Sequence, residues 1–267
     1  MDVISNSAAR YVRLREEEMS LDEYLSLCQR DPMAYAGASQ RMLSVIGEPE
    51  MVDTRNDPVL SRLFANKVIR RYPAFSEFYG MEDAIEQVVS FFRHAAQGLE
   101  ERKQILYLLG PVGGGKSSIA ERLKYLMQKA PFYALKGSPV NESPLGLFDP
   151  VEDGPVLEDE FGIPRRSLQH VLSPWAVKRL EEFGGDIRQF RVVKRYPSIL
   201  KQIGIAKTEP GDENNQDISS LVGKVDIRKL ENFSQDDTDA YSYSGGLCLA
   251  NQGLLEFVEM FKAPIKV

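Results

Sequence analysis

Apolar residues recur at helical spacing in three stretches before residue 100. The first stretch is short, and its stripe consists of Leu21, Tyr24, Leu25 and Cys28. Ser20 and Glu23 have the residue types and the spacing of a capping box, the side-chain arrangement that begins many helices. We therefore predict a small helix directly after Ser20.

Two further helices are predicted before residue 100. Asp31 followed by Pro32 is typical of a helix start, with Asp31 as the cap, and Gly47 marks its expected end. In the next stretch the apolar positions at helical spacing are Ile85, Val88, Val89, Phe92, Ala96 and Leu99. This pattern predicts a long amphipathic helix that packs on a larger body.

The pattern changes at residue 104. The run QILYLL, residues 104–109, is short and apolar and is followed by a glycine, as expected of a parallel strand buried on both faces. Residues 117–130 return to helical spacing, and PFYAL, residues 131–135, has the character of the next strand. The order strand, helix, strand predicts an α/β core.

The periodicity weakens between residues 136 and about 245. Turn-forming stretches such as KGSPVNESP and DPVEDGP surround helical pieces such as residues 173–184. The region nevertheless contains apolar residues that need burial: Trp175, Leu180, Phe183, Phe190, Ile199, Leu200 and Ile203. We therefore predict a large mixed insertion, 136–245, in a core that spans residues 56–267, preceded by a helical N-terminal appendage, 1–55.

Composition and charge exclude several classes of protein. The chain has 267 residues, a formal net charge of −6, and short basic clusters at 164–166 and 191–196 that we interpret as solvated surface, which argues against a nucleic-acid binder. Its apolar runs fall far short of a membrane helix, so we expect a cytoplasmic protein. Cys28 and Cys248 fit no metal or redox spacing and are expected to be two reduced thiols.

The strongest chemical signal is the stretch GPVGGGKSS between the predicted strand and helix. It fits the phosphate-loop pattern of glycine, four residues, glycine, lysine and serine, in the strand–loop–helix context that the mechanism requires. A glycine-rich turn with a surface lysine is the alternative, and the complete pattern in this context argues against it. The predicted nucleotide-binding residues are Gly110, Pro111, Val112, Gly113, Gly114, Gly115, Lys116, Ser117 and Ser118.

Each residue type in this loop has a chemical role. The glycines let backbone N–H groups approach the phosphates closely, and the helix N-terminus adds to their attraction for anions. Lys116 is expected to reach the β and γ phosphates, and the Ser117 hydroxyl to ligate Mg²⁺. The predicted fold class is therefore an α/β P-loop NTPase with a parallel sheet, and the predicted cofactors are ATP and Mg²⁺.

Hydrolysis needs a carboxylate that orients water, and the best candidate lies near the end of the sequence. GGLCLANQGLLEFVEM, residues 245–260, is similar to the segment with the second Walker motif in AAA+ ATPases of the Lon-like and helicase-loader-like branches. By this resemblance Glu259 is the catalytic base, beside Lys116 as the other catalytic residue, whereas Val258 stands where those relatives have aspartate. An isolated carboxylate is costly on a buried strand, so Glu256 either has a partner or substitutes for the absent aspartate from another angle.

Long blocks of the chain resemble the N-terminal AAA portion of the bacterial PrkA family of serine protein kinases. The blocks include RYPAFSEFYGMEDAIEQVV, YLLGPVGGGKSSIAERLK and AKTEPGDENNQDISSLVGKVDIRKLE. The resemblance implies an ATP-dependent protein of stress and starvation responses, a homo-oligomer in its complete form, with a kinase-like region after the AAA part. It also implies that this sequence, which ends eight residues after Glu259, stops before the sensor strand and the arginine finger.

The same resemblance suggests two further sites. It places Tyr79, Gly80 and Met81 at the adenine pocket, although ordinary packing at a helix start also explains them. PGDENNQD, residues 210–217, contains Asp212, Glu213 and Asp217, which either serve a metal or partner loop or form a solvated turn.

Three functions remain open at this point. The first is an AAA+ module that hydrolyses ATP to drive assembly or conformational change. The second is phosphoryl transfer to protein serine, although DEFG at 159–162 lacks the accompanying catalytic loop of protein kinases. The third is a nucleotide-gated binding module with little hydrolysis, which Val258 favours.

Overall fold

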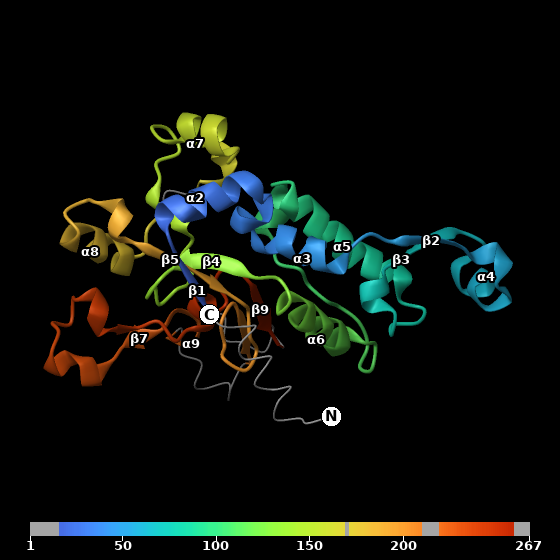
Figure 1. Cartoon of the computed structure of the whole chain (residues 1–267). Coiled ribbons are helices and arrows are strands. Elements are labelled where there is room, and N and C mark those ends of the chain that lie inside the picture. The colour runs from blue at the N-terminus through green and yellow to red at the C-terminus, as the bar shows by residue number, and fades with distance from the viewer. Residues whose placement is uncertain (1–15, 169–170, 210–218, 259–267) are drawn as a thin grey trace, which may run out of the picture. The chain divides into compact units, whose positions relative to one another are not determined.

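The computed structural model describes residues 16–168, 171–209 and 219–258, which divide into two compact units (Figure 1). Unit 1 combines residues 1–36 with 131–267, and unit 2 comprises residues 37–130. The domain boundaries expected from the sequence stay a prediction; residue 55 lies inside unit 2.

Unit 2 is a helical body with a two-stranded antiparallel sheet. Its elements are α3 (Ala38–Ile46), β2 (Glu50–Asp53), α4 (Pro58–Phe64), β3 (Val68–Arg71), α5 (Glu82–Ala96) and α6 (Lys116–Met127), with 3₁₀ turns at Thr54–Asn56, Pro73–Phe75 and Glu100–Lys103. β2 and β3 pair in antiparallel fashion, α3 packs on α5 and α6, and β3 packs on α5. Apolar faces of the three longer helices form the core; its buried residues include Met42, Ile46, Ile85, Val88, Val89, Phe92, Ile119, Leu123 and Leu126. The predicted amphipathic helix is thus confirmed as α5, except that it ends at Ala96 and leaves Leu99 outside the helix and 50% exposed.

Unit 1 contains short strands linked by helical turns. Its helices and strands are β1 (Glu17–Ser20), α2 (Leu21–Arg30), β4 (Phe132–Leu135), α7 (Gly154–Phe161), α8 (Pro174–Glu182), β5 (Arg191–Arg195), β6 (Ile205–Thr208), α9 (Ser219–Val222), β7 (Lys224–Val225), β8 (Tyr241–Ser242), α10 (Gly246–Leu249) and β9 (Leu254–Phe257). Its 3₁₀ turns are Pro32–Tyr35, Pro144–Leu147, Arg165–Ser167, Ile187–Gln189, Ile227–Glu231 and Thr238–Ala240. Figure 1 shows β1, β5 and β4 side by side, in that sheet order.

The strands of unit 1 differ from the expected parallel sheet. β5 pairs antiparallel with both β1 and β4, and β7 pairs antiparallel with β8. Among the described strands the parallel pair is β6 with β9, in the register Lys207 to Glu256. The structure is therefore a mixed α/β fold in which one pair of strands has the predicted parallel arrangement.

The capping box at Ser20 is confirmed. The Glu23 N–H donates to Ser20 Oγ at 3.1 Å, and the Ser20 N–H donates to Glu23 Oε2 at 2.6 Å. α2 begins directly afterwards and buries the predicted stripe of Leu21, Tyr24, Leu25 and Cys28 in the core of unit 1.

The helix predicted from Asp31 to Gly47 is divided into two pieces. Asp31 caps a 3₁₀ turn, Pro32–Tyr35, which ends at Ala36. α3 is a separate helix with Gly37 as its N-cap, where the Gly37 N–H donates a hydrogen bond to Gln40 Oε1 at 2.9 Å. It ends at Gly47 as predicted. The start and end signals were correct, and the prediction of one continuous helix was wrong.

The prediction of a buried strand at residues 104–109 is wrong. Residues 105–110 form no strand, and Ile105 and Leu109 are 75% and 83% exposed. A strand needs hydrogen bonds from a neighbour, and in the described part of unit 2 the sheet consists of β2 and β3 alone. By contrast PFYAL is confirmed as a strand, β4, whose four residues are buried and which pairs with β5 at the edge of its sheet.

The insertion buries some of the apolar residues that were expected to be buried, whereas Ile199 and Leu200 are 41% and 93% exposed. Phe190 lies in the core of unit 1, against which Trp175, Leu180 and Phe183 pack. The basic cluster at 191–196 lies mostly on β5. Its residues Arg191 and Lys194 form ion pairs with Glu18 at 3.1 Å and Glu17 at 3.4 Å on the neighbouring strand β1. These positive charges are matched by the acidic strand beside them.

Candidate functional site

The glycine-rich loop of unit 2 has the backbone conformation that its glycines permit. Gly113 and Gly115 both have a φ of +78°, a left-handed conformation that costs side-chain-bearing residues free energy. A Cβ atom on Gly114 would lie 3.0 Å from the Pro111 carbonyl oxygen. The loop is thus folded tightly on itself and turns directly into α6.

Lys116 is the first residue of α6, and its side chain folds back over the loop. Its ammonium group donates hydrogen bonds to the carbonyl oxygens of Gly110 at 2.7 Å and Pro111 at 2.6 Å. A positive charge is therefore held at the inner side of the turn. An incoming phosphate oxygen would compete with these two carbonyls for the ammonium.

The first turn of α6 supplies the other groups that bind anions. The first N–H groups of any α-helix lack intrahelical acceptors and carry the positive end of the helix dipole. Ser117 and Ser118 lie in this turn and are exposed, as are Pro111 and Val112. The exposed Ser117 hydroxyl is an oxygen of the kind that can ligate a magnesium ion together with phosphate oxygens and water.

Met81 connects the loop to the segment before α5. A Cβ atom on Gly115 would lie 2.9 Å from the Met81 sulfur, so the thioether occupies the space beside this glycine. The structure therefore brings together two segments that the sequence analysis assigned to one nucleotide site. Gly80 has a φ of +76°, and Tyr79 is 87% exposed.

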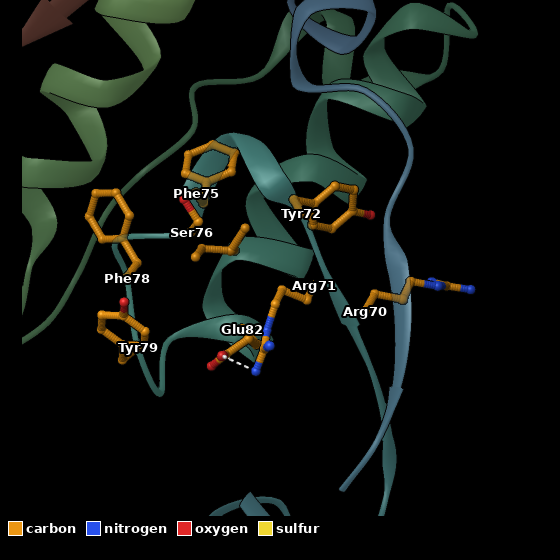
Figure 2. Close-up of a pocket in the computed structure, with 9 residues that line it drawn as sticks. Arg70, Arg71, Tyr72, Phe75, Ser76, Phe78, Tyr79 and Glu82 are labelled. Atoms are coloured by element: carbon orange, nitrogen blue, oxygen red, sulfur yellow. Dashed lines mark ion pairs between the residues drawn. The ribbon is translucent and has the colours of Figure 1, made fainter.

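A cavity of about 230 Å³ opens beside these residues (Figure 2). Its lining consists of Arg70, Arg71, Tyr72, Phe75, Ser76, Phe78, Tyr79, Glu82 and Ile85. The Tyr72 hydroxyl donates to Glu86 at 2.6 Å and accepts from Arg93 at 3.0 Å. Burial and the Glu86 carboxylate raise the pKa of Tyr72, which keeps its proton on the hydroxyl.

The sequence analysis missed this cavity because it assigned its lining residue Tyr79 to an adenine pocket, its lining residue Ile85 to a helix face, and no role to the others. A signal was available in RRYPAFSEFYGMED, in which aromatic and charged residues alternate closely before a helix. Glu82, at the start of the predicted amphipathic helix, was given no role of its own.

The second Walker-like segment is only partly described. Leu254–Phe257 forms the predicted strand, β9, and the Val258 N–H donates to the Thr208 carbonyl at 2.9 Å. Glu259 lies outside the described residues, as do Asp212, Glu213 and Asp217. Glu256 is half-buried and stands opposite Lys207 in the parallel pair, an arrangement that favours opposite charges.

Two amide side chains fix the approach to β9, which the sequence analysis did not predict. Gln252 Nε2 donates to the carbonyls of Tyr133 at 3.0 Å and Asn141 at 2.6 Å. Asn251 Nδ2 donates to the Val140 carbonyl at 2.7 Å. These bonds hold the start of β9 against the end of β4 within unit 1.

Comparison with known proteins identifies the family. The profile described as "PrkA AAA domain" matches residues 19–267, so the chain belongs to the PrkA AAA domain family. AAA domains have the P-loop NTPase fold, and the glycine-rich loop before α6 is the matching feature of this chain. No solved structure matches the chain significantly.

Two curated relatives are named for different activities. "Serine/threonine kinase YeaG" of Escherichia coli K12 is 67% identical over 271 residues, which cover 100% of this chain and 42% of the relative. "ATP-dependent protease PrkA" of Bacillus subtilis 168 is 34% identical over 272 residues, which cover 95% of this chain and 40% of the relative. The chain therefore spans about two fifths of the length of these relatives.

Among the helices in the described ranges, none is both long and apolar enough to cross a bilayer. In the same ranges no group of three or more His, Cys, Asp or Glu side chains is arranged to hold a metal ion.

Proposed function

We propose that this chain is an ATP-binding AAA module in which residues 110–118 bind the phosphates of Mg-ATP. The observation that carries the proposal is the position of Lys116, whose ammonium lies 2.6 and 2.7 Å from two carbonyls of the glycine-rich turn. A phosphate bound at a helix start is stabilised by such a positive charge beside backbone N–H groups that have no intrahelical acceptor. Ser117 would hold the magnesium ion, which supplies charge neutralisation at the phosphates when bound.

The names of the two relatives support the same proposal. One relative is named a kinase and the other an ATP-dependent protease, yet both share the portion that this chain represents. The portion common to two such names is best explained by ATP use, which both activities require. Phosphoryl transfer to protein serine, and assembly into an oligomer, are proposed for the whole protein rather than for this portion.

We further propose that Glu259 orients the water that attacks ATP. The support is the sequence match to the second Walker segment, together with the strand at Leu254–Phe257 that directly precedes it. Val258 in place of aspartate leaves the metal with fewer protein ligands, and slow hydrolysis follows from that.

Phosphate release by the purified chain, measured over a range of protein concentrations, tests hydrolysis. Turnover that rises steeply with concentration and disappears in both Lys116→Ala and Glu259→Gln supports an assembling ATPase. Turnover that is unchanged in Glu259→Gln contradicts the role of Glu259. Tight binding of ATP without turnover favours a nucleotide-gated binding module.

A further inference from the structure

Glu82 is a buried acidic residue with an unused hydrogen-bond acceptor. Its side chain is 7% exposed, and its Oε2 atom is buried without a hydrogen-bond partner. The other oxygen, Oε1, lies 3.9 Å from the Arg71 guanidinium. A buried carboxylate oxygen without a partner costs free energy, and such groups in native proteins call for an explanation.

Glu82 lines the cavity beside the glycine-rich loop. Figure 2 shows Phe78 and Tyr79 on one side of the view, Arg70, Arg71 and Tyr72 on the other, and Glu82 between them. Aromatic and polar side chains line the cavity together, and Glu82 adds a carboxylate acceptor. This combination suits a planar ring that carries an N–H group, because the ring stacks while the N–H is bonded. A volume of about 230 Å³ fits one ring system rather than a large ligand.

The cavity is connected to the phosphate loop through adjacent residues. Met81 contacts Gly115 at the start of α6, and Glu82 is the next residue along the chain. The residue before Glu82 therefore packs against the glycine-rich loop, which places the start of α5 beside the loop.

We propose that Glu82 selects the nucleotide by accepting a hydrogen bond from the exocyclic amino group of a purine base, with Arg71 holding the carboxylate in place. This inference rests on the proposed function, and it assigns base selection to a side chain. The amino group belongs to adenine or to guanine, and Glu82 offers an acceptor to either. The experiment distinguishes the two bases.

The test compares the affinity of each nucleotide with that of its analogue lacking the amino group. The two pairs are ATP with purine riboside triphosphate, and GTP with inosine triphosphate. A hydrogen bond to a charged acceptor changes affinity by about 10- to 100-fold. We expect the ATP pair to differ by this factor in the wild type and to become equal in Glu82→Leu.

The matched control is Asp83→Leu. Asp83 is exposed and lies in the same first turn of α5, so this variant removes the same charge from the helix start without touching the cavity. It should keep the wild-type ratio. Thermal unfolding of both variants shows whether they fold.

The outcomes separate this inference from the proposed function. A ratio that disappears in Glu82→Leu for one nucleotide pair supports the inference and names the base. If ATP binds in a Lys116-dependent manner and the ratios are the same in Glu82→Leu and wild type, base selection by Glu82 is wrong while phosphate binding stands. If the wild type binds none of the four nucleotides, both proposals fail.

Discussion

At the scale of single residues, Gly115 has the most demanding position in the candidate site. Its φ of +78° disfavours any side chain, and a Cβ would also meet the Met81 sulfur at 2.9 Å. The left-handed conformation alone costs about 1–2 kcal/mol for alanine. Two separate effects therefore act at one position, and suitable controls separate them.

We predict that Gly115→Ala lowers the affinity for ATP at least about tenfold, because strain and the contact with Met81 displace the loop. Gly98→Ala is the control for strain alone, since Gly98 has a φ of +82° and no atom within 4 Å of its would-be Cβ. The double variant Gly115→Ala, Met81→Ala should recover part of the affinity lost. Equal stability losses for Gly115→Ala and Gly98→Ala, with ATP binding retained, would show that the Met81 contact has no effect.

The two thiols differ in burial and therefore in chemistry. Cys28 is 1% exposed, and burial raises its pKa to about 12 from an ordinary value of 9.0. Cys248 is half-buried, and burial raises its pKa as well. A protonated, buried thiol reacts slowly with alkylating reagents.

We predict that iodoacetamide at pH 8 modifies Cys28 only after unfolding, as read by mass spectrometry of the peptides. The raised pKa also affects stability. The folded thiol keeps its proton while the unfolded thiol ionises, so stability present below pH 9 is lost as the pH rises from about 9 to about 12. Cys28→Ala should lose less stability than the wild type over this range, and an identical decline in the two proteins would contradict the burial argument.

At the scale of secondary-structure elements, α2 depends on a local signal. The capping box satisfies two backbone N–H groups with side-chain oxygens. We predict that Ser20→Ala lowers the free energy of unfolding by about 1 kcal/mol. Ser26→Ala, an exposed serine within the same helix, should have no more than a small effect, and chemical denaturation of the two variants is the measurement. Equal losses would mean that the cap does not stabilise α2.

Local signals of this kind explain which elements the sequence predicted well. The helix starts at Ser20, Asp31 and Ser173 depend on side chains within three residues of the caps, and the structure has those caps. Strand pairing is not local. Residues 104–109 have the composition of a buried strand, but a strand exists only where a neighbour donates and accepts hydrogen bonds, which composition cannot specify.

The candidate site was predictable to the same extent. The phosphate-loop pattern identified residues 110–118 because its spacing is a property of the chain itself. The packing of Met81 on Gly115 joins residues that are distant in the sequence. The Glu82 oxygen is left without a hydrogen-bond partner because the fold buries it. Such contacts follow from the fold and could not be derived from periodicity.

At the scale of the whole molecule, the two units contain different candidate functional residues. The glycine-rich loop, Met81 and the cavity at Glu82 all lie in unit 2. The strand that leads toward Glu259 lies in unit 1 and is held there by Gln252 and Asn251. The proposed binding of ATP rests on residues within unit 2.

The central claim is that residues 110–118 bind ATP, and calorimetric titration of the intact chain with Mg-ATP tests it most directly. Lys116→Ala removes the ammonium that lies on the loop, whereas Lys103→Ala removes an exposed lysine elsewhere in unit 2, with 79% of its side chain accessible. We expect saturable binding in the wild type and in Lys103→Ala, and at least about 100-fold weaker binding in Lys116→Ala. Equal affinity in all three proteins, or no binding by the wild type, would contradict the claim.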